Sequence, residues 1–327
     1  MSDTVSVMSP LRYESATHSL SPLNSQLLSL SELALDLEQH LRKRNLRHQS
    51  QLKNAATKRC LKLMFKYNAR SISELYDQCD STEWAELLYV ADVSLHKHLN
   101  VALEMYIKDS LQFQRQDRWL WLVKNAKRIP DEIEEFKRLF RAQNINIVNF
   151  SNDVFNLLRC VDAKKNCLRL IGAPNSGKTL IAQLIASVFI ASYVNNHNSE
   201  NEFYLSCFLN TALNVCEELM ISPATAEDFK SILGGAPLMI SKKYSPKQIL
   251  IRTPVIVTSN HSQFGRGHIA PTDEAALRLR CYTYTFSDMY RPSIILTLPS
   301  LAYLIYVSCD NPNKYCVPYF FRHSFTR

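Results

Sequence analysis

The segment that most restricts how this chain can fold is a glycine-rich turn between two apolar runs. It consists of Gly172, Ala173, Pro174, Asn175, Ser176, Gly177, Lys178 and Thr179. The apolar residues 167–171 before it predict a buried strand, and residues 180–190 after it predict a helix. In that setting the glycines let backbone N–H groups face phosphate oxygens, the lysine reaches the β and γ phosphates, and the threonine hydroxyl binds Mg²⁺. The sequence therefore predicts a nucleoside triphosphate site, and the alternative is a plain glycine-rich turn.

Composition narrows the class of protein. The 327 residues have room for about two domains, and the formal net charge of +8 favours a polyanionic partner such as nucleic acid. Nine cysteines without a C-x-x-C pair indicate a reducing compartment rather than a disulfide framework or a zinc site. The apolar segment 293–307 is shorter than the roughly 20 residues that span a bilayer and contains Pro299. We therefore expect a buried strand or helix there, and no membrane partner.

Periodicity divides the chain into four regions. Residues 1–30 are rich in Ser, Thr and Pro and predict a flexible tail, while residues 31–150 show helical periodicity and a basic balance. From 151 to 290 short apolar strands alternate with helices, which predicts an α/β fold with a parallel sheet and flanking helices. Residues 291–327 match no pattern and stay unassigned. We expect the helical region to serve oligomerisation or DNA contact.

The helical region carries local start signals and a long basic run. Ser71 and Glu74 are spaced as a capping box, and Pro130 suits the first turn of a helix. Between positions 38 and 74 every charged residue is basic, which suits contact with a phosphate backbone or, at 42–47, a nuclear import signal. A solvated helix face is an equally good interpretation. The basic residues are Arg42, Lys43, Arg44, Arg47, Lys53, Lys58, Arg59, Lys62, Lys66 and Arg70.

Two adjacent carboxylates end a second predicted strand, about forty residues beyond the lysine of the glycine-rich turn. They are Glu217 and Glu218. A phosphate-binding loop needs one acid at such a strand end to hold Mg²⁺ through water and another to polarise the attacking water. We assign the metal to Glu217 together with Thr179, and the attacking water to Glu218. Adjacent glutamates are also common on surface helices, and this pair alone does not exclude that alternative.

A third apolar segment, 252–260, is rich in β-branched residues and ends in Asn260. The amide of an asparagine at a strand end can bond the γ-phosphate and the attacking water together. Ahead of this segment, Gly234 and Gly235 precede a set of basic residues. This order predicts a hairpin that grips a nucleic-acid backbone, or otherwise an ordinary basic hairpin. Its lysines are Lys242, Lys243 and Lys247.

The motifs in this order resemble those of superfamily 3 helicases: GAPNSGKT, the glutamate pair, ILGGAPLMISKKYSPKQ and RTPVIVTSN. They are most similar to the helicase domain of parvoviral replication proteins, over about residues 167–286. The resemblance implies an AAA+-like domain that uses ATP and Mg²⁺. It further implies that Lys243 contacts single-stranded DNA, with Lys242 and Lys247 in the same loop. Arg280 falls at the arginine finger that reaches the γ-phosphate held by a neighbouring subunit.

The sequence also departs from that family. Parvoviral replication proteins usually carry an N-terminal nicking endonuclease with a His-hydrophobic-His motif, which this sequence does not show. His96 and His98 flank a lysine, and we expect them to be surface histidines. Asn214 stands where the family prefers a bulky apolar residue, so we expect its strand to be less well buried. The chain resembles a helicase-only version, similar in size to bidnavirus replication proteins, or a truncated or captured viral gene.

The function implied by the resemblance is ATP-dependent unwinding of DNA in the 3′ to 5′ direction by a ring of identical subunits, commonly a hexamer. Such a helicase replicates the genome of a small single-stranded DNA virus in the host nucleus. Its partners are single-stranded DNA, copies of itself and other viral replication proteins. Two alternatives stay open at this point. One is a catalytically silent ATP- or DNA-binding relic or scaffold, and the other is a small-molecule kinase with a phosphate-binding loop.

Overall fold

The computed structural model describes residues 39, 43, 54–67, 69–91, 94–195, 203–243 and 245–311. The expected tail (1–30) lies outside the described residues, and so does the expected import signal (42–47) apart from residue 43. The helices ahead of the sheet are α2 (Ala55–Tyr67), α3 (Ile72–Gln78), α4 (Ser81–Ala91), α5 (Leu95–Gln116), α6 (Arg118–Val123), α7 (Pro130–Ala142) and α8 (Ile147–Leu158). The later elements are β1 (Cys167–Gly172), α9 (Lys178–Ala186), β2 (Ala191–Asn195), η2 (Ser206–Phe208), β3 (Leu213–Glu217), α10 (Ala226–Gly234), β4 (Leu238–Lys242), β5 (Ser245–Leu250), β6 (Val255–Ser259), α11 (Pro271–Arg278), β7 (Cys281–Phe286) and α12 (Leu298–Ser308).

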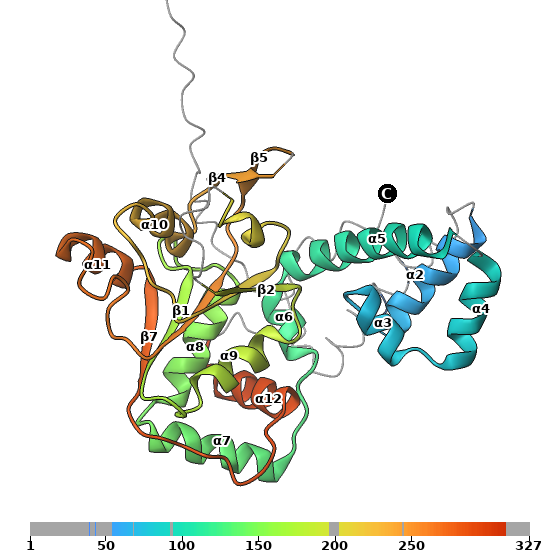
Figure 1. The fold of residues 1–327 in the computed structure, drawn as a ribbon. Helices are drawn as coiled ribbons and strands as arrows, with labels where there is room; N and C mark the ends of the chain where they lie inside the picture. Colours follow the sequence, from blue (N-terminus) through green and yellow to red (C-terminus); the bar gives the residue numbers. More distant parts are fainter. Residues whose placement is uncertain are drawn as a thin grey trace, which may run out of the picture.

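Helices α2 to α5 form a unit with its own apolar core, at one end of the long α5 (Figure 1). The capping box is confirmed, because Ser71 Oγ accepts the backbone N–H of Glu74 at 3.0 Å and α3 begins directly after Ser71. Pro130 likewise opens α7, as predicted. The fully buried members of the core are Cys60, Leu61, Met64, Ala69, Leu75, Leu87 and Ala102.

Part of the basic run binds within the protein. Arg59 and Lys66 of α2 form ion pairs with glutamates of α4, and Arg70 donates two hydrogen bonds to carbonyl groups that follow α9. Lys58 and Lys62, by contrast, are exposed on α2. The run is therefore not one uninterrupted basic face. The partners of the three bound residues are Glu86, Glu83, Ser187 and Phe189.

Five strands form a parallel sheet in the order β2-β3-β6-β1-β7, which confirms the predicted α/β fold. Parallel strands are covered by crossover helices on both faces, which explains why β1, β3 and β6 are almost entirely buried. The register pairs Ile171 with Ser259, and Glu217 with Thr258. The carboxyl ends of β1, β3 and β6 therefore lie side by side. We call this side of the sheet the carboxyl edge, and the opposite side the amino edge.

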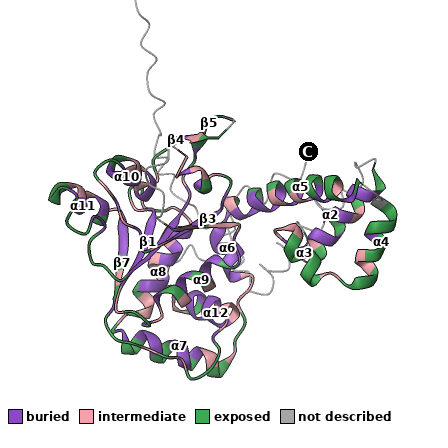
Figure 2. Ribbon diagram, in the orientation of Figure 1, coloured by how far each residue is buried: buried purple, intermediate pink, exposed green. Residues whose placement is uncertain are grey.

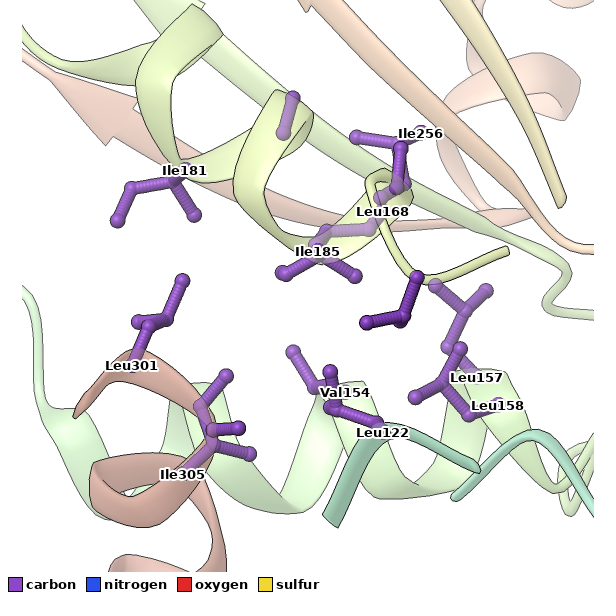
Figure 3. Packing of buried hydrophobic residues seen from close by; sticks show 14 of the residues in the cluster. Leu122, Val154, Leu157, Leu158, Leu168, Ile181, Ile185, Ile256, Leu301 and Ile305 are labelled. Carbon is purple, nitrogen blue, oxygen red and sulfur yellow. The ribbon is translucent and has the colours of Figure 1, made fainter. Parts of the chain in front are cut away.

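The two faces of the sheet are packed against different helices. On one face α6, α7, α8, α9 and α12 share a core with the sheet, and Figure 3 shows α9 and α12 meeting side chains of α8 and β1. On the other face α10 and α11 cover a second cluster. Figure 2 shows the strands buried between these layers. The hairpin of β4 and β5 pairs antiparallel and projects away from the sheet (Figure 1).

The packing places the division between the two cores earlier than the boundary expected near residue 151. Ser151 lies fully buried inside α8, and residues from Leu111 onward share the core of the sheet. The division therefore falls along α5. The apolar segment 293–307 forms most of α12, whose Leu301 and Ile305 are fully buried, as expected for a buried helix. Among the described residues, no helix combines the length and the apolar character that a membrane crossing needs.

The expectation that β3 would be less well buried is wrong. Asn214 is 0% exposed, and its neighbours in the strand are buried as well. The amide oxygen of Asn214 accepts hydrogen bonds from the hydroxyls of Ser192, at 2.6 Å, and Thr211, at 2.8 Å. Buried polar atoms are tolerated when they are hydrogen-bonded, and these hydroxyls satisfy the amide oxygen of Asn214, whereas its amide nitrogen has no partner among the described residues.

Candidate functional site

The glycine-rich turn joins β1 to α9 as the sequence predicted, and its two glycines are required by geometry. Gly172 has a φ of 127°, and a Cβ on it would overlap the carbonyl oxygen of Phe286 in β7. Gly177 has a φ of 96°, and a Cβ there would lie 2.9 Å from Leu139 Cδ1. Because α9 begins at Lys178, the first N–H groups of this helix have no partner within the helix and can bind an anion.

Lys178 is buried at the base of this turn, with a relative exposure of 5%. Its ammonium group donates hydrogen bonds to the carbonyl oxygens of Gly172, at 3.1 Å, and Ala173, and to Ser176 Oγ and Asn260 Oδ1, each at 3.2 Å. Burial lowers the pKa of Lys178, and the negative charge of Glu218 acts in the opposite direction. A buried cation surrounded by neutral oxygens favours the approach of an anion.

Glu218 and Asn260 meet at the carboxyl edge, where β3 and β6 end. Glu218 Oε1 accepts the backbone N–H of Asn260 at 2.9 Å, and Oε2 accepts the hydroxyl of Ser259 at 3.2 Å. Since Asn260 Oδ1 also contacts Lys178, the structure brings together three of the residues singled out in the sequence. Arg266 lies 3.6 Å from Glu218 Oε2 and was not predicted. The only local hint was its position between Gly265 and Gly267.

These residues border an open pocket of about 860 Å³. Four of the fourteen lining residues were not predicted from the sequence, because residues 289–292 come after the last strand and match no motif. Thr179 borders the pocket and is exposed. The lining residues are Pro174, Asn175, Ser176, Gly177, Lys178, Thr179, Leu180, Glu218, Thr258, Asn260, Met289, Tyr290, Arg291 and Pro292.

The segment 288–293 is fixed to both the turn and α7. The backbone N–H of Tyr290 donates to the carbonyl of Asn175 at 2.9 Å, and its hydroxyl donates to Glu135 Oε1 at 2.9 Å. The amide of Gln143 donates to the carbonyl of Asp288 at 2.7 Å and lies 3.4 Å from that of Ser176. This wall of the pocket is therefore held by hydrogen bonds at both of its sides.

The other predicted residues lie outside the pocket lining. Glu217 Oε1 accepts a hydrogen bond from the Gln183 amide of α9 at 3.4 Å, next to the pocket rather than within its wall. Arg280 lies at the amino edge, just before β7, and donates to the carbonyl of Ala276. Its side chain packs on Gly234, as a Cβ there would lie 3.0 Å from Arg280 Nε. The three lysines of the hairpin, Lys242, Lys243 and Lys247, are exposed.

Only one of the two histidines expected at the surface is fully exposed. His96 is exposed, whereas His98 is half-buried, with Thr57 Oγ1 2.8 Å from Nδ1 and Ser94 Oγ 3.0 Å from Nε2. His98 therefore links α5 to α2. Within the described ranges, no group of three or more His, Cys, Asp or Glu side chains is arranged to hold a metal ion.

Known proteins share both the fold and the family of this chain. A crystal structure of JCV helicase matches with a TM-score of 0.54 and 10% sequence identity, over 83% of this chain and 91% of that one. The chain thus shares the fold of that helicase, an α/β fold with a parallel sheet and a phosphate-binding loop. The model of the family "Parvovirus non-structural protein NS1" matches residues 95–263, just over half of the chain. The chain belongs to this family.

Curated relatives agree with this placement. The initiator protein NS1 of Bombyx mori densovirus is 26% identical over 135 residues, which are 41% of this chain and 15% of that protein. The replication protein E1 of pygmy chimpanzee papillomavirus type 1 is 26% identical over 145 residues, 43% of this chain and 22% of that protein. The chain thus matches less than a quarter of the length of either relative.

Proposed function

We propose that this chain is an ATP-driven DNA helicase that serves the replication of a small single-stranded DNA virus. The observation that carries the proposal is the pocket at the carboxyl edge, where Lys178 at the start of α9 meets Glu218 and Asn260 at the ends of β3 and β6. Family membership and the helicase-like fold support it. The relatives' names, initiator protein and replication protein, agree with a task in replication.

The pocket suits the triphosphate of ATP with Mg²⁺. The N-terminus of α9 and the buried ammonium of Lys178 would bind the β and γ phosphates. Thr179 and Glu217 would hold Mg²⁺, which neutralises phosphate charge when it is bound. Glu218 would orient the attacking water, and Asn260 would bond the γ-phosphate. The nucleoside would lie against Met289 to Pro292, since these residues form the wall next to Asn175.

The amino edge suggests why one subunit would not suffice. The six residues of β7 separate the backbone of Arg280 from the glycine-rich turn by about 20 Å, at roughly 3.3 Å per residue. Arg280 is therefore too distant to stabilise charge on a phosphate bound in its own subunit. We propose that Arg280 completes the pocket of a neighbouring copy in a ring, commonly a hexamer in this family, and that the hairpin lysines grip single-stranded DNA during 3′ to 5′ movement.

The test is ATP hydrolysis by the purified chain with and without single-stranded DNA, beside Lys178→Ala, Arg280→Ala and a mixture of the two variants. A shared site predicts stimulation by DNA, loss of turnover in each variant, and partial recovery in the mixture. Nucleotide and DNA binding without any turnover would indicate a silent relic or scaffold instead. Phosphorylation of free nucleosides would indicate a small-molecule kinase.

We further propose that the chain acts in the host nucleus with other viral replication proteins, using the basic segment 42–47 as an import signal. A fluorescent fusion of the full chain should accumulate in nuclei. Substituting the basic residues of that segment should leave it in the cytoplasm. Equal nuclear levels of both fusions would rule out this signal.

A further inference from the structure

Arg266 and Glu218 form a pair in which both backbones are strained. Arg266 Nη2 lies 3.6 Å from Glu218 Oε2 and also donates to the backbone carbonyl of Glu218 at 3.3 Å. Arg266 has a φ of 49° and Glu218 a φ of 50°, a left-handed conformation that residues with a long side chain rarely adopt. Such conformations persist only where the surroundings impose them, and they are frequent at functional sites.

The loop that carries Arg266 is held from three directions. Both carboxylate oxygens of the buried Glu274 in α11 accept backbone N–H groups of this loop, from Phe264 at 3.0 Å and Gly265 at 3.1 Å. The guanidinium of Arg169, in β1, lies 4.0 Å from the ring centroid of Phe264. In addition, the carbonyl of Phe264 accepts the N–H of Ile221, three residues after Glu218. The loop is therefore fixed to the same chain segment whose carboxylate it faces.

The carboxylate of Glu218 is thus contacted from two sides, by hydrogen-bond donors on one and by a positive charge on the other. The backbone N–H of Asn260 and the hydroxyl of Ser259 come from the end of β6, and the guanidinium of Arg266 comes from the far end of the following loop. A glutamate side chain has three rotatable bonds, and donors on one side alone leave it able to turn away from the pocket. A positive charge on the second side attracts the carboxylate and restricts that motion.

We propose that Arg266 is a positioning residue for ATP hydrolysis, which holds the Glu218 carboxylate where it can orient the attacking water. This inference rests on the proposed function of the pocket. Arg266 is not among the residues that line the pocket, so it acts through Glu218 and not on the nucleotide. Its removal should slow the chemical step and leave nucleotide binding unchanged, because only an interaction that matters in the transition state changes the rate of that step.

The test is single-turnover hydrolysis of radiolabelled ATP by the full chain with single-stranded DNA. The main variant is Arg266→Asn, since asparagine tolerates the left-handed backbone and should not disturb the loop. We expect its rate constant to fall about five- to tenfold, Arg266→Lys to recover part of the loss, and affinity for a non-hydrolysable ATP analogue to stay within twofold. Arg128→Ala, which removes an exposed arginine ahead of α7, is the charge-matched control and should equal the wild type.

A double-mutant cycle then shows whether Arg266 acts through Glu218. In a Glu218→Gln background, Arg266→Asn should change the residual rate by less than twofold, because the carboxylate to be positioned is gone. An equal fold loss in both backgrounds, or a loss of nucleotide affinity, would overturn the positioning role. If the wild type hydrolyses ATP and Arg266→Asn is equally active, this inference is refuted while the proposed function stands. A wild type without turnover would refute the proposed function and this inference with it.

Discussion

The two edges of the sheet are built in different ways. At the carboxyl edge Asn260 contacts both Lys178 and Glu218, and the three residues follow the adjacent strands β6, β1 and β3. At the amino edge Arg280 binds the carbonyl of Ala276 in the helix before it and rests on Gly234. The carboxyl edge is thus held together by hydrogen bonds between residues distant in sequence, whereas the hydrogen bond of the Arg280 guanidinium goes to a residue only four positions earlier.

This difference suggests what each edge requires. A preorganised set of polar groups can bind a triphosphate without outside help, since its partners are already in place. An arginine at a strand start, distant from the pocket of its own subunit, becomes useful only when another molecule approaches it. Affinity for nucleotide should therefore be a property of the single chain, and fast turnover a property of the assembly.

The largest expected effect separates these two properties. Lys178→Ala should reduce ATP turnover at least a hundredfold and also weaken nucleotide binding, because the buried cation beneath the turn is lost. Arg280→Ala should reduce turnover as strongly, since arginine fingers contribute about a thousandfold or more, yet bind nucleotide like the wild type. Fluorescent-nucleotide titration beside steady-state turnover measures both. Equal loss of nucleotide binding in the two variants would contradict the assignment of nucleotide affinity to the carboxyl edge alone.

The next effect concerns the stability of the carboxyl edge. Gly172→Ala adds a Cβ that overlaps the carbonyl of Phe286 and forces an unfavourable φ, so it should destabilise the fold by about 3 kcal/mol. Gly267→Ala is the matched control, since its φ of 89° is also strained but a Cβ meets nothing within 4 Å. That change should cost only about 1 kcal/mol. Chemical denaturation of both variants distinguishes close contact from backbone strain.

Features encoded by neighbouring residues were predicted correctly from the sequence. The glycine-rich turn between β1 and α9, the capping box at Ser71 and the helix start at Pro130 each depend on residues within one or two turns. The parallel sheet followed from the alternation of apolar strands and helices. Such local patterns are readable because their physical cause lies inside the segment itself.

Features that depend on distant partners were missed. Met289 and Tyr290 enter the pocket wall because Glu135 of α7 and Gln143, directly after that helix, hold the segment that contains them. No local pattern predicts that contact, since its partners are about 150 positions apart. The burial of Asn214 was misjudged for a similar reason, since a hydroxyl of another strand accounts for it. Long-range hydrogen bonds thus determine the residue positions that could not be predicted from the sequence.

A smaller effect is expected at the projecting hairpin. If Lys243 contacts the phosphate backbone, Lys243→Ala should lower affinity for single-stranded DNA about three- to tenfold and reduce the salt dependence by about one phosphate contact. Lys62→Ala, an exposed lysine of α2, is the control for loss of one positive charge and should change affinity less. Fluorescence anisotropy at several salt concentrations compares them. Identical losses would assign DNA binding to overall charge rather than to the hairpin.

The smallest effect concerns the pocket wall at low pH. The backbone N–H of Ser293 lowers the pKa of Glu135 below its ordinary value of 4.5. Burial alone would raise the pKa of Glu132, but hydrogen bonds from Thr297 and Ser300 outweigh it and lower that pKa as well. Because the folded-state values are depressed, both carboxylates stabilise the fold fully above about pH 4.5, and their contribution is lost as the pH falls through the folded-state pKa values.

Glu135→Gln and Glu132→Gln should therefore melt a few degrees below the wild type at pH 7, and the difference should shrink as the pH falls below 4. Amide hydrogen exchange at Ser293 and Thr297 gives a local measure, because both N–H groups donate to these carboxylates. Exchange should quicken in the variants at neutral pH, while the core of α2 to α5 stays as protected as before. A melting difference that persists unchanged at low pH would mean that the side chains act by packing and not by charge. In that case the wall beside the nucleotide would not loosen with acid, and the carboxyl edge would owe its rigidity to the loop and strands alone.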